Sequence, residues 1–141
     1  MDNIDFGDLN YLAVLVAVVF NQVLGAAWYG ALSRPWMAET GMTQEDIDAM
    51  KGTSRQWVPY VVAIVLAIVF TLGLALLVQG MGADNAGEGL GLGVLAAVGF
   101  VLTSHGVNYA FEGRSLKLLA INVGYPLISY ALIGLLLAVW D

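Results

Sequence analysis

The sequence predicts an all-α integral membrane protein, a four-helix up-down bundle with both termini on the non-cytoplasmic side. Three observations predict it: a high apolar content, four long windows with almost no charge, and basic residues confined to two connections. Sixty per cent of the 141 residues are apolar and 11% are charged, whereas soluble domains carry about a quarter charged residues. Long uncharged windows are typical of membrane spans rather than of a large soluble core.

Four apolar windows are long enough to cross a bilayer. We expect spans at about residues 9–32, 57–80, 90–111 and 116–140, within a single transmembrane domain that covers residues 1–141. At a rise of about 1.5 Å per residue, each helix covers roughly 33–36 Å, enough for a hydrocarbon core of about 30 Å. The charged residue inside these bounds is Lys117, whose amine can reach the interface from the first turn of the last span.

The distribution of charge predicts the orientation of the spans. All five basic residues lie between the first and second spans or where the third span turns into the fourth: Arg34, Lys51, Arg55, Arg114 and Lys117. The other ends of the spans carry acids instead: Asp2, Asp5, Asp8, Asp84, Glu88 and Asp141. Basic connections stay in the cytoplasm during membrane insertion. The two termini and the second connection are therefore expected outside.

The first connection, residues 33–56, is long enough for structure of its own. Thr43 suits a helix N-cap and acids follow it in the first turn, while Gly52 suits the position after the helix end. We therefore expect a short cytoplasmic helix at about residues 44–51. Two interpretations are open: a helix that docks a partner or gates a pathway, or a simple crossover.

Polar side chains recur inside three of the spans, where hydrocarbon cannot satisfy them. His105 and Asn108 share one helix face, and the same spacing places Asn122, Tyr125 and Ser129 on one face of the last span. We expect spans one, three and four to meet along a polar seam that opens to the cytoplasm. The predicted members are Asn21, Gln22, His105, Asn108, Asn122, Tyr125 and Ser129. The other interpretation is hydrogen bonding that only holds helices together.

Small residues and one charge pair complete the candidate sites. Gly89 and Gly93 have the GxxxG spacing that allows close helix packing, and Gly25 lies on the same face as Asn21. Such spacing does not separate contacts within a chain from contacts between copies, so a homo-oligomer is one expectation. Glu112 and Arg114 are expected to form an interfacial ion pair at the turn after the third span, with Lys117 and Arg34 as alternative partners of Glu112.

Composition argues against several classes of function. A formal charge of −6 argues against nucleic acid as a partner, and the lack of cysteine removes thiolate chemistry and disulfides. Ser104 and His105 are neighbours, but neighbours on a helix point about 100° apart, and no buried acid completes a triad. We expect no enzymatic activity, no cofactor and no metal.

Several motifs resemble one family. They are Gly25-x-x-Trp28-Tyr29-Gly30, then Asn108-Tyr109-x-Phe111-Glu112-Gly113-Arg114, then Asn122-x-Gly124-Tyr125. They resemble the small bacterial membrane proteins called domain of unknown function 1761, over nearly the whole chain. The resemblance implies a four-span protein, which we expect in the bacterial cytoplasmic (inner) membrane. Pro126 stands where a histidine is expected in many members, which weakens any mechanism that needs a second imidazole there.

Two functions from different classes are open. The first is a small transporter or channel-like bundle whose polar seam opens to the cytoplasm. The second is an accessory or structural subunit of a larger membrane complex. The expected partners are the lipid bilayer and either further copies of the chain or other membrane proteins.

Overall fold

Residues 3–140 of the computed structural model are described here, and they form seven α-helices, one 3₁₀ helix and one π-helical segment. In chain order the elements are η1 (Phe6–Asp8), α1 (Tyr11–Ala31), α2 (Ser33–Thr40), α3 (Gln44–Met50), α4 (Ser54–Met81), α5 (Ala86–Ala96), the π-helical η2 (Ala97–Leu102), α6 (Thr103–Glu112) and α7 (Leu116–Val139).

Four of these helices are long and apolar enough to cross a membrane. They are α1, α4, the continuous helix formed by α5, η2 and α6, and α7, with lengths of 21, 28, 27 and 24 residues. The predicted all-helical fold with four candidate spans is confirmed. The expected span at residues 57–80 begins earlier, at Ser54, and the span expected from residue 90 begins at Ala86. The side chain of Asn85 caps α5 by accepting a hydrogen bond from the backbone N–H of Glu88. This cap explains why α5 begins before the apolar window does.

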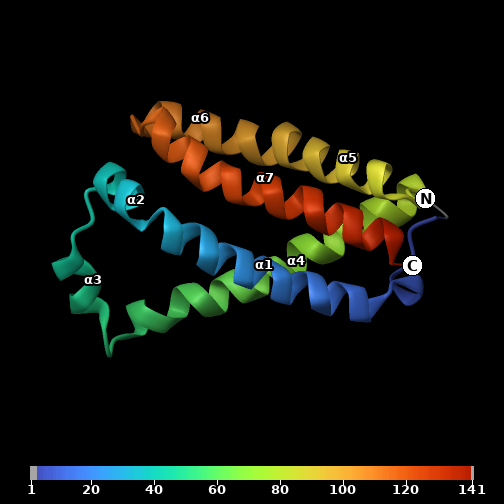
Figure 1. Ribbon diagram of the computed structural model, residues 1–141, viewed down its shortest axis with the longest axis horizontal. Coiled ribbons are helices and arrows are strands. Elements are labelled where there is room, and N and C mark those ends of the chain that lie inside the picture. The colour runs from blue at the N-terminus through green and yellow to red at the C-terminus, as the bar shows by residue number, and fades with distance from the viewer. Residues whose placement is uncertain (1–2, 141) are drawn as a thin grey trace.

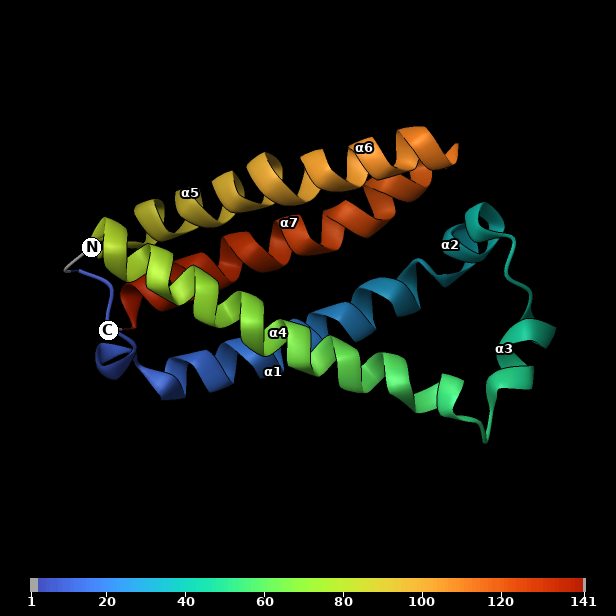
Figure 2. The same cartoon turned by 180° about the vertical axis from the view of Figure 1, so that it is seen from behind.

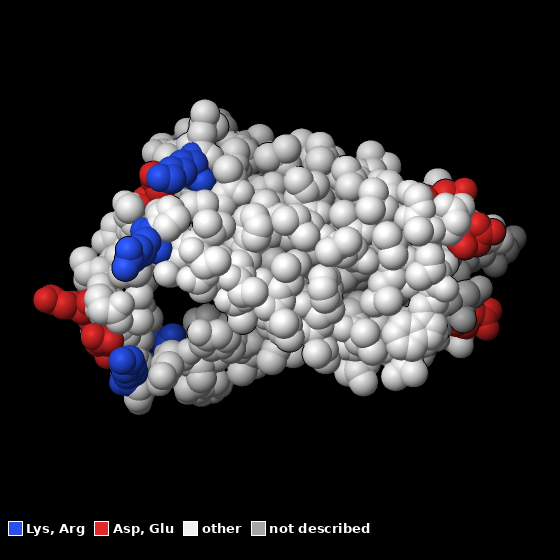
Figure 3. Space-filling view, viewed as in Figure 1, with Lys and Arg blue, Asp and Glu red and all other residues white. Residues whose placement is uncertain are grey.

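The long helices run back and forth between two ends of the molecule (Figures 1 and 2). One end, here called the acidic end, carries Asp5, Asp8, Asp84 and Glu88 close to η1 and the start of α5. The opposite end, here called the basic end, carries every Lys and Arg, and α2 and α3 lie there (Figures 1 and 3). The half of the bundle next to the acidic end is the acidic half, and the half next to the basic end is the basic half.

The connection between α1 and α4 holds two helices. The sequence predicts one short helix at 44–51, and α3 spans Gln44–Met50 with a reciprocal capping box between Thr43 and Asp46. The additional helix α2 follows α1 after a single residue and ends at Gly41, whose φ of 73° suits glycine. Pro35 stands in its first turn, where a missing N–H costs nothing. The connection is therefore a two-helix strap across the basic end.

Burial divides α4 into two parts. Its buried residues run from Ala67 to Val78, in the acidic half, where Leu74 packs with Ala17 and Ile133 in the core. Every residue from Ser54 to Leu66 is exposed. The two ribbon views agree that α4 crosses α1 and then diverges from it toward the basic end (Figures 1 and 2). The bundle is thus closed in its acidic half and open in its basic half.

Candidate functional site

Close glycine contacts hold α5 against α7 in the acidic half. A Cβ added to Gly93 would overlap the carbonyl oxygen of Tyr130, and one added to Gly89 would overlap the carbonyl oxygen of Gly134. Both contacts are to backbone, which cannot turn aside as a flexible side chain can. The structure therefore places the two glycines predicted for packing within one chain, against α7, where they hold the hairpin of α5 and α7 together.

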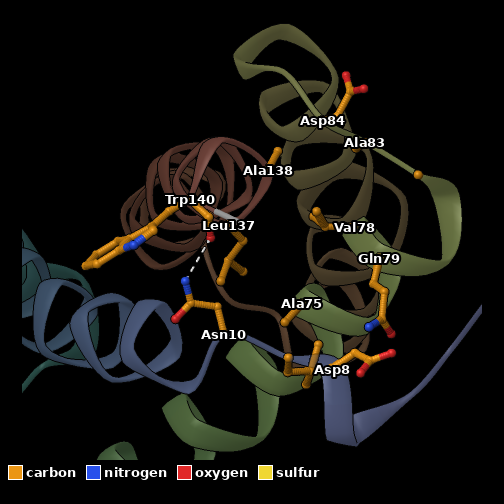
Figure 4. A pocket seen from close by; sticks show the side chains of 12 residues that line it. Asp8, Asn10, Ala75, Val78, Gln79, Ala83, Asp84, Leu137, Ala138 and Trp140 are labelled. Atoms are coloured by element: carbon orange, nitrogen blue, oxygen red, sulfur yellow. Dashed lines mark hydrogen bonds between the residues drawn. The ribbon is translucent and has the colours of Figure 1, made fainter.

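Hydrogen bonds join the elements at the acidic end. The side-chain amide of Asn10 donates to the carbonyl of Trp140 at 3.2 Å, which ties the start of α1 to the end of α7 (Figure 4). Gln79 accepts from the backbone N–H of Asp5 at 2.8 Å and donates to its carbonyl at 3.1 Å. The cavity that Asn10, Gln79 and Trp140 border is small, about 210 Å³. At the acidic end, side-chain amides therefore bind backbone groups of neighbouring elements and hold those elements together.

Two glycines and two aromatic side chains interlock α1 with α7. A Cβ on Gly25 would lie 3.1 Å from the hydroxyl of Tyr125, and a Cβ on Gly124 would lie 2.7 Å from the ring of Trp28. The indole N–H of Trp28 also donates to the carbonyl of Ile121 at 2.9 Å. Each helix thus offers one glycine to the aromatic residue of the other. Gly25, predicted for packing, lies at this interface.

The polar seam begins at a buried amide in the middle of α1. Asn21 accepts from the hydroxyl of Ser129 through Oδ1 at 2.6 Å, and its carbonyl accepts from the hydroxyl of Tyr125 at 2.9 Å. Asn21 and Ser129 are both buried. Three of the predicted seam residues, from two spans far apart in sequence, therefore lie together.

A second polar cluster lies nearer the basic end. Asn122 accepts from the hydroxyl of Tyr29 at 3.0 Å and donates to the hydroxyl of Tyr109 at 2.6 Å. The rings of Tyr29 and Tyr125 meet edge to face, with centroids 5.9 Å apart. Asn122 thereby links α1, α6 and α7, and the tyrosine pair joins this cluster to the bonds around Asn21. The seam is continuous from mid-span to the basic end.

Helix geometry changes just before His105. The six residues of η2 are π-helical, a form that occurs mostly as short interruptions and frequently at functional sites. Nδ1 of His105 lies 2.9 Å from the carbonyl oxygen of Val101. A carbonyl oxygen only accepts, so Nδ1 carries the proton in this contact. Within residues 3–140 the other ring nitrogen, Nε2, makes no hydrogen bond.

His105 lines a cavity between α4 and α6. This cavity, here called the lateral cavity, has a volume of about 450 Å³ and is bordered by α1 and α7 as well. Its walls are mostly apolar, and Asn21, Gln22, His105 and Tyr125 supply polar groups. The side-chain amide of Gln22 donates a hydrogen bond to the carbonyl of Ala63 in α4, at 3.5 Å. Four predicted seam residues therefore border one cavity.

A second cavity opens at the basic end, under the strap formed by α2 and α3. This cavity, here called the aromatic cavity, has a volume of about 520 Å³. It lies where the space-filling view shows the molecule hollowed between the strap and the start of α4 (Figure 3). Its lining comes from five helices and consists of Tyr29, Ser33, Trp36, Met37, Ile47, Pro59, Tyr60 and Asn122.

The remaining predicted residues lie at the surface. Asn108 is exposed and does not join the seam, and within the described chain its side chain makes no hydrogen bond. Glu112 and Arg114 form an ion pair at 2.8 Å with both side chains about half exposed, so it contributes little to stability. The guanidinium of Arg114 also lies 5.1 Å from the ring centre of Tyr109.

Three aromatic residues act in ways that the sequence analysis did not assign. Trp28, Tyr29 and Tyr109 are the kinds of residue found in interfacial aromatic belts, yet each donates or accepts a hydrogen bond inside the bundle. Trp28 stands seven residues after Asn21, on the same helix face. That spacing indicates that the side chain of Trp28 points into the bundle, as Asn21 does.

Of three comparisons with known proteins, the one with protein families gives a match. Neither the curated proteins nor the solved structures include a match to this chain. The model of one family matches residues 12–138, nearly the whole chain, including both cavities and the seam. The chain belongs to the family described as protein of unknown function (DUF1761).

Proposed function

We propose that the chain is a multi-pass protein of the bacterial cytoplasmic membrane, arranged as an up-down bundle with its basic end in the cytoplasm. The separation of charge supports this orientation, because every Lys and Arg lies at one end (Figure 3). Basic segments resist translocation across the membrane. In this arrangement both termini face outward, and the strap of α2 and α3 lies at the cytoplasmic surface.

Within that membrane, the chain acts as a small transporter that binds an amphipathic solute along its polar seam. The lateral cavity carries this proposal: an apolar space of about 450 Å³ bordered by Asn21, Gln22, His105 and Tyr125. Sites for small molecules combine apolar walls with a few placed polar groups. Nε2 of His105, the ring nitrogen that does not carry the proton, is a hydrogen-bond acceptor that residues 3–140 leave unused. The proposal requires binding and movement, and no chemical conversion.

Uptake into proteoliposomes tests the transport proposal. The probe is ethidium, an amphipathic fluorophore whose emission rises when it reaches DNA sealed inside the vesicles. Wild-type protein should accelerate uptake over protein-free vesicles, and His105→Ala should remove most of that acceleration. Ser104→Ala is the matched control, because this exposed hydroxyl donates to the carbonyl of Phe100 in its own helix. Uptake no faster than in protein-free vesicles would reject transport of this class of solute.

A second function, a subunit of a larger membrane assembly, is favoured by Asn108. Its side chain is exposed on α6 next to Val107, which is 58% exposed, in a segment that hydrocarbon would surround. Lipid tails cannot satisfy an amide, whereas a neighbouring helix can. Gly99 and Gly106 leave open space on the same helix. A second copy of the chain or another protein would supply the missing partner.

Single-cysteine crosslinking separates these partners, because the chain has no cysteine of its own. Asn108→Cys should form a disulfide-linked dimer in native membranes if a second copy packs there. A heavier adduct with a short bifunctional reagent would indicate a different protein. Val65→Cys on the exposed part of α4 is the control for random collision. Equal, low crosslinking at both positions would argue that lipid covers Asn108.

A further inference from the structure

We propose that the aromatic cavity at the basic end binds an organic cation of the quaternary ammonium type. Tyr29 from α1, Trp36 from α2 and Tyr60 from α4 border this space of about 520 Å³, so three aromatic side chains come together from three helices. Aromatic faces attract cations, and cages of such rings recognise quaternary ammonium groups. The site goes beyond the transport proposal, because it lies in a different cavity and requires no movement of solute.

Hydrogen bonds hold one wall of the cavity in place. The hydroxyl of Tyr29 donates to Asn122, and its ring meets Tyr125 edge to face. The helix that carries Trp36 is tied to α7 through Glu39, which accepts from the hydroxyl of Ser115 at 2.6 Å. These contacts fix α1 and α2 relative to α7 without using the open space. The part of the binding surface that Tyr29 and Trp36 provide is therefore organised before a ligand arrives, which lowers the entropic cost of binding.

The lining also selects against other classes of ligand. No Lys or Arg is among the residues that border the cavity, so an anion would find no opposite charge there. The amide of Asn122 already accepts from Tyr29 and donates to Tyr109. A primary ammonium is strongly hydrated and needs hydrogen-bond acceptors to replace its water. A quaternary ammonium has no N–H to satisfy, so an aromatic surface with few free polar groups suits it better.

Calorimetric titration of the purified chain in an uncharged maltoside detergent tests the assignment. The probes are benzyltrimethylammonium, its uncharged isostere neopentylbenzene, and phenylmethanesulfonate, each corrected for heat in detergent alone. The cation should bind about tenfold more tightly than the isostere, and the sulfonate should not bind. Equal affinity for cation and isostere would overturn the proposal, since the cavity would then be selecting apolar shape alone. Preference for the sulfonate would overturn it as well.

Variants locate the binding. Tyr60→Leu should weaken binding of the cation about tenfold, whereas Tyr60→Phe should retain it, because the ring face rather than the hydroxyl is used. Tyr60 is 71% exposed, so its replacement leaves the packing intact and folding does not confuse the result. Trp57→Leu is the control: it lies one turn away on α4, is 58% exposed and does not border the cavity. Equal binding by Tyr60→Leu and wild type would reject the site.

A trimethylammonium group can come from a soluble cation or from a lipid headgroup, and nanodiscs distinguish the two. In phosphatidylglycerol nanodiscs the soluble cation should bind as it does in detergent. If phosphatidylcholine nanodiscs suppress this binding in wild type, the lipid headgroup occupies the same site. Unchanged binding in phosphatidylcholine assigns the site to soluble cations. Because no transport is measured, a failed uptake assay with successful cation binding would reject the transporter alone.

Discussion

The acidic and basic halves of the bundle use small and large side chains in opposite ways. In the acidic half, Gly89 and Gly93 bring the backbones of α5 and α7 into contact. In the basic half, Gly25 and Gly124 instead make room for the aromatic rings of Tyr125 and Trp28. Glycine thus allows backbone contact at one end and ring insertion at the other. The helices approach closely where the bundle is closed, and the lateral and aromatic cavities border the part of α4 that has diverged.

The polar seam and α4 each contain a buried hydroxyl, and the two differ in hydrogen bonding. Ser129 and Thr71 are both fully buried, at 0% exposure. Ser129 donates to Asn21, whereas the hydroxyl of Thr71 has no hydrogen-bond partner among residues 3–140. An unsatisfied buried hydroxyl lowers stability, and a satisfied one does not. The hydroxyl of Ser129 therefore stabilises the contact between α1 and α7, whereas among residues 3–140 the hydroxyl of Thr71 makes no such contribution.

The largest expected effect lies in the closed half. Gly93→Ala would place a methyl group against the carbonyl oxygen of Tyr130, so α5 and α7 would have to separate. We expect a loss on the order of 3 kcal/mol in the free energy of unfolding, measured by titration with SDS in mixed micelles. Gly91→Ala is the control, because a Cβ there meets nothing within 4 Å. Equal stability of the two variants would show that the halves do not differ in closeness of packing.

A pair of substitutions tests the two hydroxyls. Ser129→Ala leaves the buried oxygen of Asn21 without its donor and should cost about 2 kcal/mol. Thr71→Val keeps the shape of the side chain and removes the unsatisfied hydroxyl, so the same titration should show unchanged or increased stability. A clear loss for Thr71→Val would mean that its hydroxyl has a partner, such as a buried water, and is part of a polar network.

A smaller effect is expected at the interlock of α1 and α7. Trp28→Phe keeps a large ring beside Gly124 but removes the bond to the carbonyl of Ile121, which should cost about 1 kcal/mol. The exposed Trp57→Phe should change nothing measurable. A loss as large as that for Gly93→Ala would show that the open half depends on close packing as much as the closed half does.

The smallest effect concerns the strap. The backbone N–H of Thr43 donates to the carboxylate of Asp46 at 2.9 Å, and the hydroxyl of Thr43 accepts from the backbone N–H of Asp46 at 3.2 Å. The hydrogen bond from the backbone of Thr43 keeps the pKa of Asp46 below its usual value. A carboxyl with a lowered folded pKa stabilises α3 fully above its unfolded pKa of about 3.9, and this contribution disappears as pH falls through the folded value. The amide proton shift of Thr43, followed by NMR, should therefore change only in acid. Asp46→Asn should remove that titration, and a change near neutral pH would assign it to another group.

The outlines of the site could be predicted from spacing, and its connections could not. The i, i+3, i+7 pattern grouped Asn122, Tyr125 and Ser129 on one face, and the structure brings the last two to Asn21. Asn108 fits the same pattern with His105 but is exposed. The i→i+5 pattern of η2 makes wider turns than a regular α-helix, which rotates α6 relative to the face expected for a regular helix. A regular period cannot predict where such an interruption falls.

Hydropathy and charge along the chain determined that there are four apolar helices, and which of their ends carry the basic residues. These properties are local, because each segment alone is apolar enough for a bilayer or charged enough to remain in water. Only the tertiary structure decided that Gly93 meets backbone while Gly124 meets a ring. It also decided that, among residues 3–140, Thr71 lacks the hydrogen-bond partner that Ser129 has, and that α4 leaves room for the lateral and aromatic cavities. Those outcomes depend on the angles at which helices cross, and crossing angles follow from all side chains at an interface together.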